Sequence, residues 1–212
     1  MVFPLLATGV SAIFAAFVLA QYGRRRHRYQ LVWGIGLAFF ALASAAGFLA
    51  RSGGATDLEY RLFYLFGAIL NVAWLALGTL SLLAPRRIAD GALAVVLGFS
   101  VVSAFAVFAS PVDLTAATDT GRGFQDAVVP RILAGLGSGL GTLVLAGGAL
   151  WSGWGFLRRG RQGRRALANL VIAAGVLITA AGGTAAFTGA SGVVEVTNLV
   201  GVSVMFIGFL LV

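Results

Sequence analysis

The residues most able to do chemistry in this 212-residue chain form a polar stripe between Tyr64 and Ser81. Its members recur at spacings of three and four residues, which places them on one face of a helix: Tyr64, Gly67, Asn71, Trp74, Gly78 and Ser81. Asn71 comes ten residues after Arg61, or about 15 Å along a helix axis, which is close to the midplane of a bilayer. An amide and an indole N–H at that depth need partners, because an unpaired polar group costs several kcal/mol in hydrocarbon.

Two interpretations of this stripe stay open. In one, Asn71 joins two helices through an interhelical hydrogen bond, which contributes about 0.6–2 kcal/mol. In the other, Tyr64, Asn71 and Trp74 line a midplane pocket that binds a small neutral molecule, at the depth where transporters bind their substrates. A fainter polar face that includes Glu195 and Asn198 comes near the end of the chain, and Asn198 is therefore included in the predicted pocket.

Four charged residues stand where apolar stretches begin on one side of the membrane: Glu59, Arg61, Arg131 and Glu195. We expect ion pairs between Arg61 and Glu59 and between Arg131 and Glu195. Such pairs act as structural clamps, which is the interpretation we prefer. In the alternative, they form an external vestibule that controls access to a pocket.

The sequence lacks the residues that most intramembrane enzymes need. It contains no cysteine and no lysine, and its one histidine, His27, lies among arginines outside the apolar stretches. Histidine-based metal or haem ligation, a Schiff-base cofactor and a Ser–His protease are therefore excluded within the membrane. All aspartates fall in loops, which argues against an aspartyl protease or a proton pump with a carboxylate relay. We expect no enzymatic activity, no cofactor and no metal site.

The elements that position these residues are seven apolar stretches. The composition is 59% hydrophobic and 10% charged, whereas soluble domains have about a quarter charged residues. Each stretch is close to the roughly 20 residues that a helix needs to cross a bilayer: 2–21, 31–50, 62–84, 91–109, 132–156, 166–189 and 193–212. The sequence therefore predicts an all-α polytopic membrane protein, a single seven-helix transmembrane domain over residues 1–212.

The arginines predict how this bundle is oriented. Eleven of the fifteen lie in the loops after the first, third and fifth stretches: Arg24, Arg25, Arg26, Arg28, Arg86, Arg87, Arg158, Arg159, Arg161, Arg164 and Arg165. The chain is expected in the inner (plasma) membrane of the cell. The positive-inside rule then places the N-terminus outside the cell and the C-terminus at the cytoplasmic face. The net charge of +8 comes from arginines in these short loops. We therefore expect these arginines to face anionic lipid headgroups and not to bind nucleic acid.

The stretches divide into two triplets, 1–84 and 131–212, around a linker helix at 91–109, which predicts a parallel triple-helix repeat. The one long connection runs from Ser110 to Arg131 on the predicted outer side. It is either a partly ordered cap over the bundle or a plain loop, and we expect the plain loop.

Glycines are dense in the fifth stretch, where two GxxxG pairs occur, Gly135 with Gly139 and Gly137 with Gly141. Small residues at this spacing let helix backbones approach closely. They serve packing within the chain, or association with a second copy or another membrane protein.

Three segments carry a resemblance to known proteins: 61–80, 130–141 and 147–154. In these the chain resembles a group of uncharacterised seven-helix membrane proteins from GC-rich, actinobacteria-like genomes, and this resemblance implies no activity. In topology, and in an asparagine in the third and seventh spans, the chain is also similar to SWEET-type transporters. The prolines expected within SWEET helices are missing, because Pro4, Pro85, Pro111 and Pro130 lie at helix ends or in loops.

The function predicted from these features is binding or transport of a small neutral molecule. The alternatives are a non-catalytic structural or accessory subunit of a membrane complex, and a sensor-like seven-helix module.

Overall fold

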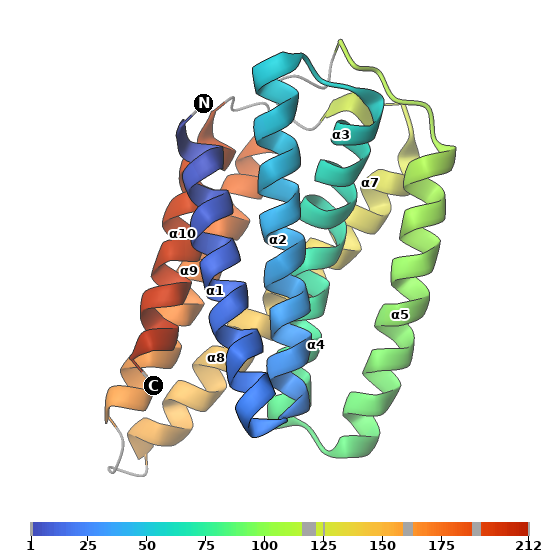
Figure 1. Cartoon of the computed structure of the whole chain (residues 1–212). Helices are drawn as coiled ribbons and strands as arrows, with labels where there is room; N and C mark the ends of the chain where they lie inside the picture. The colour runs from blue at the N-terminus through green and yellow to red at the C-terminus, as the bar shows by residue number, and fades with distance from the viewer. Residues whose placement is uncertain (1, 116–121, 125, 159–162, 188–191, 212) are drawn as a thin grey trace.

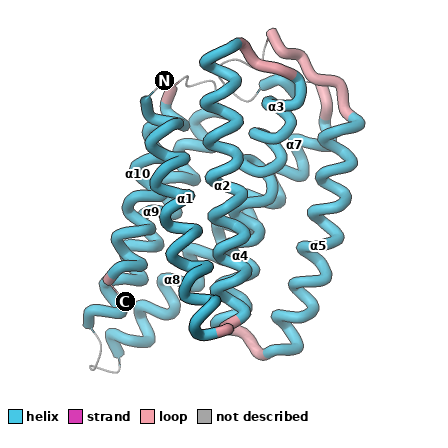
Figure 2. The backbone as a smooth tube through the Cα atoms, viewed as in Figure 1, coloured by secondary structure: helices cyan, strands magenta, loops and turns pink. Residues whose placement is uncertain are grey.

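The computed structural model of the chain describes residues 2–115, 122–124, 126–158, 163–187 and 192–211 (Figure 1). Figure 2 shows that these ranges are helical with short connections, and no strand occurs within them. Seven helices in the described ranges are long and apolar enough to cross a membrane. The predicted all-α bundle of membrane-spanning helices is confirmed.

Five of the spans are single helices: α1 (Val2–Arg25), α2 (Arg28–Gly53), α5 (Arg86–Ala109), α9 (Gly163–Phe187) and α10 (Val193–Leu210). The third and fifth spans each contain a π-helical segment between two α-helical ones. The third consists of α3 (Asp57–Phe63), η1 (Tyr64–Leu70) and α4 (Asn71–Leu83). The fifth consists of α7 (Val128–Ala134), η3 (Gly135–Leu140) and α8 (Gly141–Arg158), and the short turn η2 (Arg122–Phe124) precedes it.

The helices coincide with the predicted stretches and mostly extend a few polar residues beyond them. The third span begins early because Thr56 and Glu59 form a capping box, in which each side chain accepts a hydrogen bond from the backbone N–H of the other. Pro85 stands directly before α5, where its missing N–H costs nothing. The predicted ends at 188–189 and 212 lie outside the described residues.

The third span occupies the centre of the bundle. Its neighbours are α2, α5 and α8, while α9 and α10 continue from α8 and close the bundle against α1 (Figure 1). Within the protein, 61% of its most apolar window is buried, against 17% for α5, which stands at the edge of the bundle. The polar stripe on the third span therefore faces other helices and not lipid.

The two termini lie at opposite ends of the bundle (Figure 1), as an odd number of spans requires. We refer to the end with the N-terminus as the N-terminal face and to the other as the C-terminal face. Arg28, Asp90 and Arg86 form ion pairs on the C-terminal face, where the first and third inter-helix loops lie. The direction in which the bundle crosses the membrane stays a prediction, as does the repeat of 1–84 and 131–212.

The long connection after α5 is a cap in its described parts, so the expected plain loop is wrong there. Phe124 is 1% exposed and packs its ring on Tyr60 and Tyr64, with centroid distances of 5.5 and 4.8 Å. The backbone N–H of Gly123 donates to the Tyr60 hydroxyl at 2.9 Å, and the N–H of Asp113 donates to the Gly123 carbonyl at 2.9 Å. Phe124 therefore anchors the described part of this connection to the third span.

Candidate binding site at the N-terminal face

The predicted midplane residues lie next to the π-helical turn of the third span. A π-helix bonds each N–H to the carbonyl five residues back, and the N–H of Asn71 donates to Phe66 in this way. Where the helix returns to α-helical spacing, one backbone carbonyl receives no hydrogen bond from the ladder, and the hydrogen bonds of the neighbouring N–H groups are displaced. Asn71 is 3% exposed, and its Oδ1 accepts from the backbone N–H of Val72 at 2.6 Å. The amide oxygen of Asn71 is therefore engaged on its own helix, which the interhelical interpretation did not foresee.

A hydrogen bond between the third and fifth spans is made one turn earlier, by a residue that the sequence analysis did not single out as a site. Ser138 in η3 donates through its hydroxyl to the carbonyl of Ala68 in η1 at 2.5 Å. Beside it, a Cβ at Gly137 would overlap the carbonyl oxygen of Ile69. The two π-helical turns thus pack backbone to backbone, and a hydroxyl from one supplies a donor to a carbonyl of the other.

Trp74 and Tyr64 are also committed to packing. The indole N–H of Trp74 donates to Ser100 on α5 at 3.1 Å, and the ring stands edge-on to Phe39. Tyr64 is 1% exposed beneath Phe124. Tyr64, Asn71 and Trp74 share one buried face, but none of them lines the pocket described next.

The pocket opens at the N-terminal face, between α1, α2, α3 and α10. Its volume is about 20 Å³, enough for about one water molecule, and its lining combines charged, polar and small apolar residues: Pro4, Ala7, Ser44, Gly47, Arg51, Phe63, Val194, Glu195 and Asn198. Two predicted residues, Asn198 and Glu195, therefore lie at one site, three residues apart on α10. They lie apart from the stripe on the third span.

Arg51 and Glu195 form an ion pair in the wall of this pocket, from the last turn of α2 to the first turn of α10. The Arg51 side chain is 29% exposed and the Glu195 side chain 14%, so both charges are partly shielded from water. The predicted pairing of Glu195 with Arg131 is wrong, because Glu195 pairs with Arg51 instead. Arg51 was missed as a site residue, although its place at the end of an apolar stretch on the same side as Glu195 was a usable signal.

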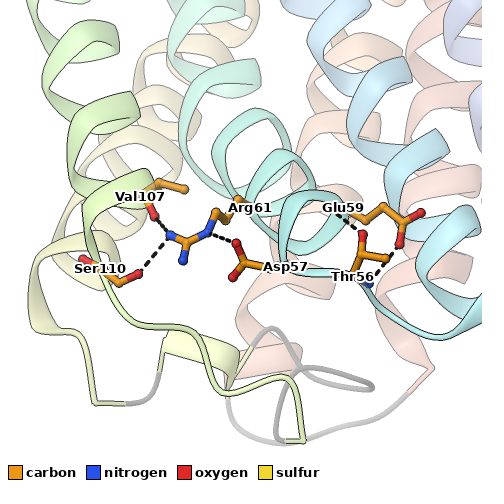
Figure 3. Close-up of polar contacts among 6 residues, drawn as sticks. All are labelled: Thr56, Asp57, Glu59, Arg61, Val107 and Ser110. Atoms are coloured by element: carbon orange, nitrogen blue, oxygen red, sulfur yellow. Dashed lines mark hydrogen bonds and ion pairs between the residues drawn. The ribbon is translucent and has the colours of Figure 1, made fainter.

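The other predicted ion pair is also wrong. Glu59 caps α3 through Thr56, and Arg61 pairs instead with Asp57, with 2.7 Å between Nε and Oδ2 (Figure 3). The Arg61 guanidinium also donates to the carbonyls of Val107 and Ser110 at the end of α5. Carbonyls at a helix C-terminus attract a cation, so Arg61 ties the third span to α5.

Arg131 lies on the exposed side of α7. Among the described residues, no three side chains of the His, Cys, Asp or Glu type come together as metal ligands.

Comparison with protein families, with curated proteins and with solved structures found no match. The helices themselves define the class to which the chain belongs. It is a multi-pass integral membrane protein built as a helical bundle.

Proposed function

We propose that this protein binds a small polar molecule without net charge in the pocket between α1, α2, α3 and α10. The observation that carries the proposal is the lining of that pocket, where a guanidinium, a carboxylate and an amide meet: Arg51, Glu195 and Asn198. Ligand sites typically combine apolar walls with a few convergent polar groups.

The predicted location of the site changes, whereas the predicted kind of ligand is kept. A midplane pocket would need Asn71 and Trp74 to be available, and the Asn71 amide oxygen and the Trp74 indole N–H are both engaged in hydrogen bonds within the protein. With the arginine-poor face outside, the pocket takes up its ligand from the external medium. Transport of the ligand would further require the packed helices below the pocket to separate.

Native mass spectrometry of protein released from its own membranes tests the proposal. We expect a reproducible non-lipid adduct on the unaltered chain that is lost in Asn198→Ala. Asn169→Ala is the matched control, because it removes the same amide from a hydrogen bond between α9 and α8 that does not line the pocket. An adduct that survives Asn198→Ala but is lost in Asn71→Ala would overturn the pocket in favour of a midplane site, and a chain without any small-molecule adduct would overturn binding itself.

A second function, that of an accessory subunit, is favoured by one specific observation. Gly135 and Gly139, one of the two GxxxG pairs, have no atom within 4 Å of a Cβ built on them, whereas Gly137 and Gly141 are filled by the third span. The outward pair leaves a shallow surface to which a helix of another chain could pack closely.

Co-purification distinguishes this second function. If it holds, a protein partner or second copy accompanies the unaltered chain and is lost in Gly139→Phe. Gly98→Phe on α5, which adds the same side chain at an equally open glycine, should leave the association intact. A chain that runs as a monomer in both variants and without substitution contradicts this function.

A further inference from the structure

Resting on the proposed binding role, we infer that the ligand is a small zwitterion, with a cationic amine and an anionic carboxylate separated by a short chain. The inference starts from the charge balance of the pocket. Its lining contains one positive and one negative side chain, Arg51 and Glu195, which face each other across the gap between α2 and α10.

A ligand that carries a single charge does not suit this site. An anion would take Arg51 from its partner and leave the Glu195 carboxylate, 14% exposed, without a counter-charge. A cation would do the same to Arg51. Removing one partner of a partly buried ion pair is unfavourable, because the remaining charge is only partly solvated and has no other counter-charge in the lining of the pocket.

An uncharged polar ligand is also at a disadvantage. Any of these ligands needs more space than the present 20 Å³ and has to separate Arg51 from Glu195, but the hydroxyl or amide groups of an uncharged ligand would replace a full ion pair with weaker dipoles. A zwitterion exchanges one ion pair for two. Its carboxylate pairs with Arg51, its amine pairs with Glu195, and the net charge of the site stays at zero.

The remaining lining limits the size of the ligand. Asn198 lies about one helical turn below Glu195, and Ser44 about two turns below Arg51, so both offer neutral hydrogen bonds on the deeper side. The pocket is narrow at Gly47, where an added Cβ would already lie 3.2 Å from the Phe63 ring. A molecule with one or two carbons between its charged groups fits this description better than a long chain.

Four compounds of almost equal size and shape differ in charge, so they test whether binding requires both charges: glycine, glycinamide, glycolate and glycolamide. They carry both charges, a cation only, an anion only and neither, respectively. Thermal unfolding of the full chain in lipid nanodiscs should show a concentration-dependent rise of the midpoint with glycine, because a ligand that binds only the folded state stabilises it. The other three compounds should have apparent affinities about tenfold to a hundredfold weaker, since each lacks at least one charge-assisted hydrogen bond.

Two variants assign the effect to the pocket. Arg51→Gln and Glu195→Gln should each weaken glycine binding by about tenfold to a hundredfold. Asp57→Asn is the matched control, because it breaks the ion pair with Arg61 at the same face without touching the pocket. Equal loss in Asp57→Asn would overturn the assignment.

The comparison of the four compounds on the unaltered protein needs no variant, so the inference stays testable if the variants fail to fold. Stabilisation by glycolamide that equals or exceeds that by glycine would overturn the zwitterion and leave the proposed function standing. If none of the four has an effect, the inference fails, and the adduct in native mass spectrometry decides whether the proposed function fails with it.

Discussion

At the scale of single residues, the chemistry of this protein depends on how each polar side chain finds a partner where water is scarce. Residue type alone was informative at Asn198 and Glu195, which the sequence analysis selected and the structure places in one pocket. It was not informative about partners. Arg51 reaches Glu195 only because α2 and α10, which are far apart in the chain, lie close in space, and no local pattern encodes that proximity.

Asn71 shows a second limit of sequence reasoning. Its type and depth predicted a buried polar group, which is correct, since it is 3% exposed. Its role depends on the π-helical turn that precedes it, and the residues of that turn, Tyr64–Leu70, have the same apolar character as an ordinary helix. Hydropathy therefore predicts the membrane span but not the π-helical turn within it.

The close approach of the two π-helical turns gives the first prediction. Gly137→Ala should destabilise the fold by about 1–3 kcal/mol, because the added methyl group overlaps the carbonyl oxygen of Ile69 and the backbones must separate. Gly135→Ala introduces the same methyl group two residues away, where nothing lies within 4 Å, and should be neutral or stabilise by up to about 1 kcal/mol. Reversible unfolding in mixed micelles measures both, and equal stabilities would contradict the backbone contact.

At the scale of elements, the seven spans were predictable because a bilayer requires long apolar helices whose backbone groups are satisfied internally. The cap was not predictable in the same way. The segment from Ser110 to Arg131 is polar overall, and its described part packs on the bundle through an aromatic side chain, Phe124, whose burial requires the third span beneath it.

A second prediction follows for this cap. Phe124→Ala should lower the free energy of unfolding by about 3 kcal/mol and expose the connection after α5 to proteases, because the packing on Tyr60 and Tyr64 is lost. Phe105→Ala removes the same ring from a site on α5 that is 77% exposed, and should leave both properties close to those of the unaltered protein. Limited proteolysis in nanodiscs distinguishes them, and a cap that is cleaved equally in the unaltered chain would refute its packing on the bundle.

At the scale of the whole molecule, the arrangement of helices does not say which face of the bundle is cytoplasmic. The distribution of arginines predicts it. The structure places the two termini at opposite faces, and Arg28, Arg86 and Arg164 belong to the C-terminal face. The ion pairs between Arg28, Arg86 and Asp90 also lie there. Orientation matters for function because it decides from which side the pocket is filled.

The third prediction concerns this orientation. The chain contains no cysteine, so single cysteines can be introduced without removing others. Ser52→Cys at the N-terminal face should react with a membrane-impermeant maleimide in intact cells, whereas Gly91→Cys near the opposite face should react only after the cells are opened. The reverse pattern would contradict the external location of the N-terminus.

The central claim is that the water-accessible polar site lies at the N-terminal face and not at the midplane. The most direct test compares Asn198→Cys with Asn71→Cys by their rates of modification with a small, charged methanethiosulfonate reagent in nanodiscs. We predict that Asn198→Cys reacts, because the residue lines an open pocket, and that Asn71→Cys does not, because it is enclosed by the third span and its neighbours. Rapid modification of Asn71→Cys together with an unreactive Asn198→Cys would contradict the account and return the site to the midplane.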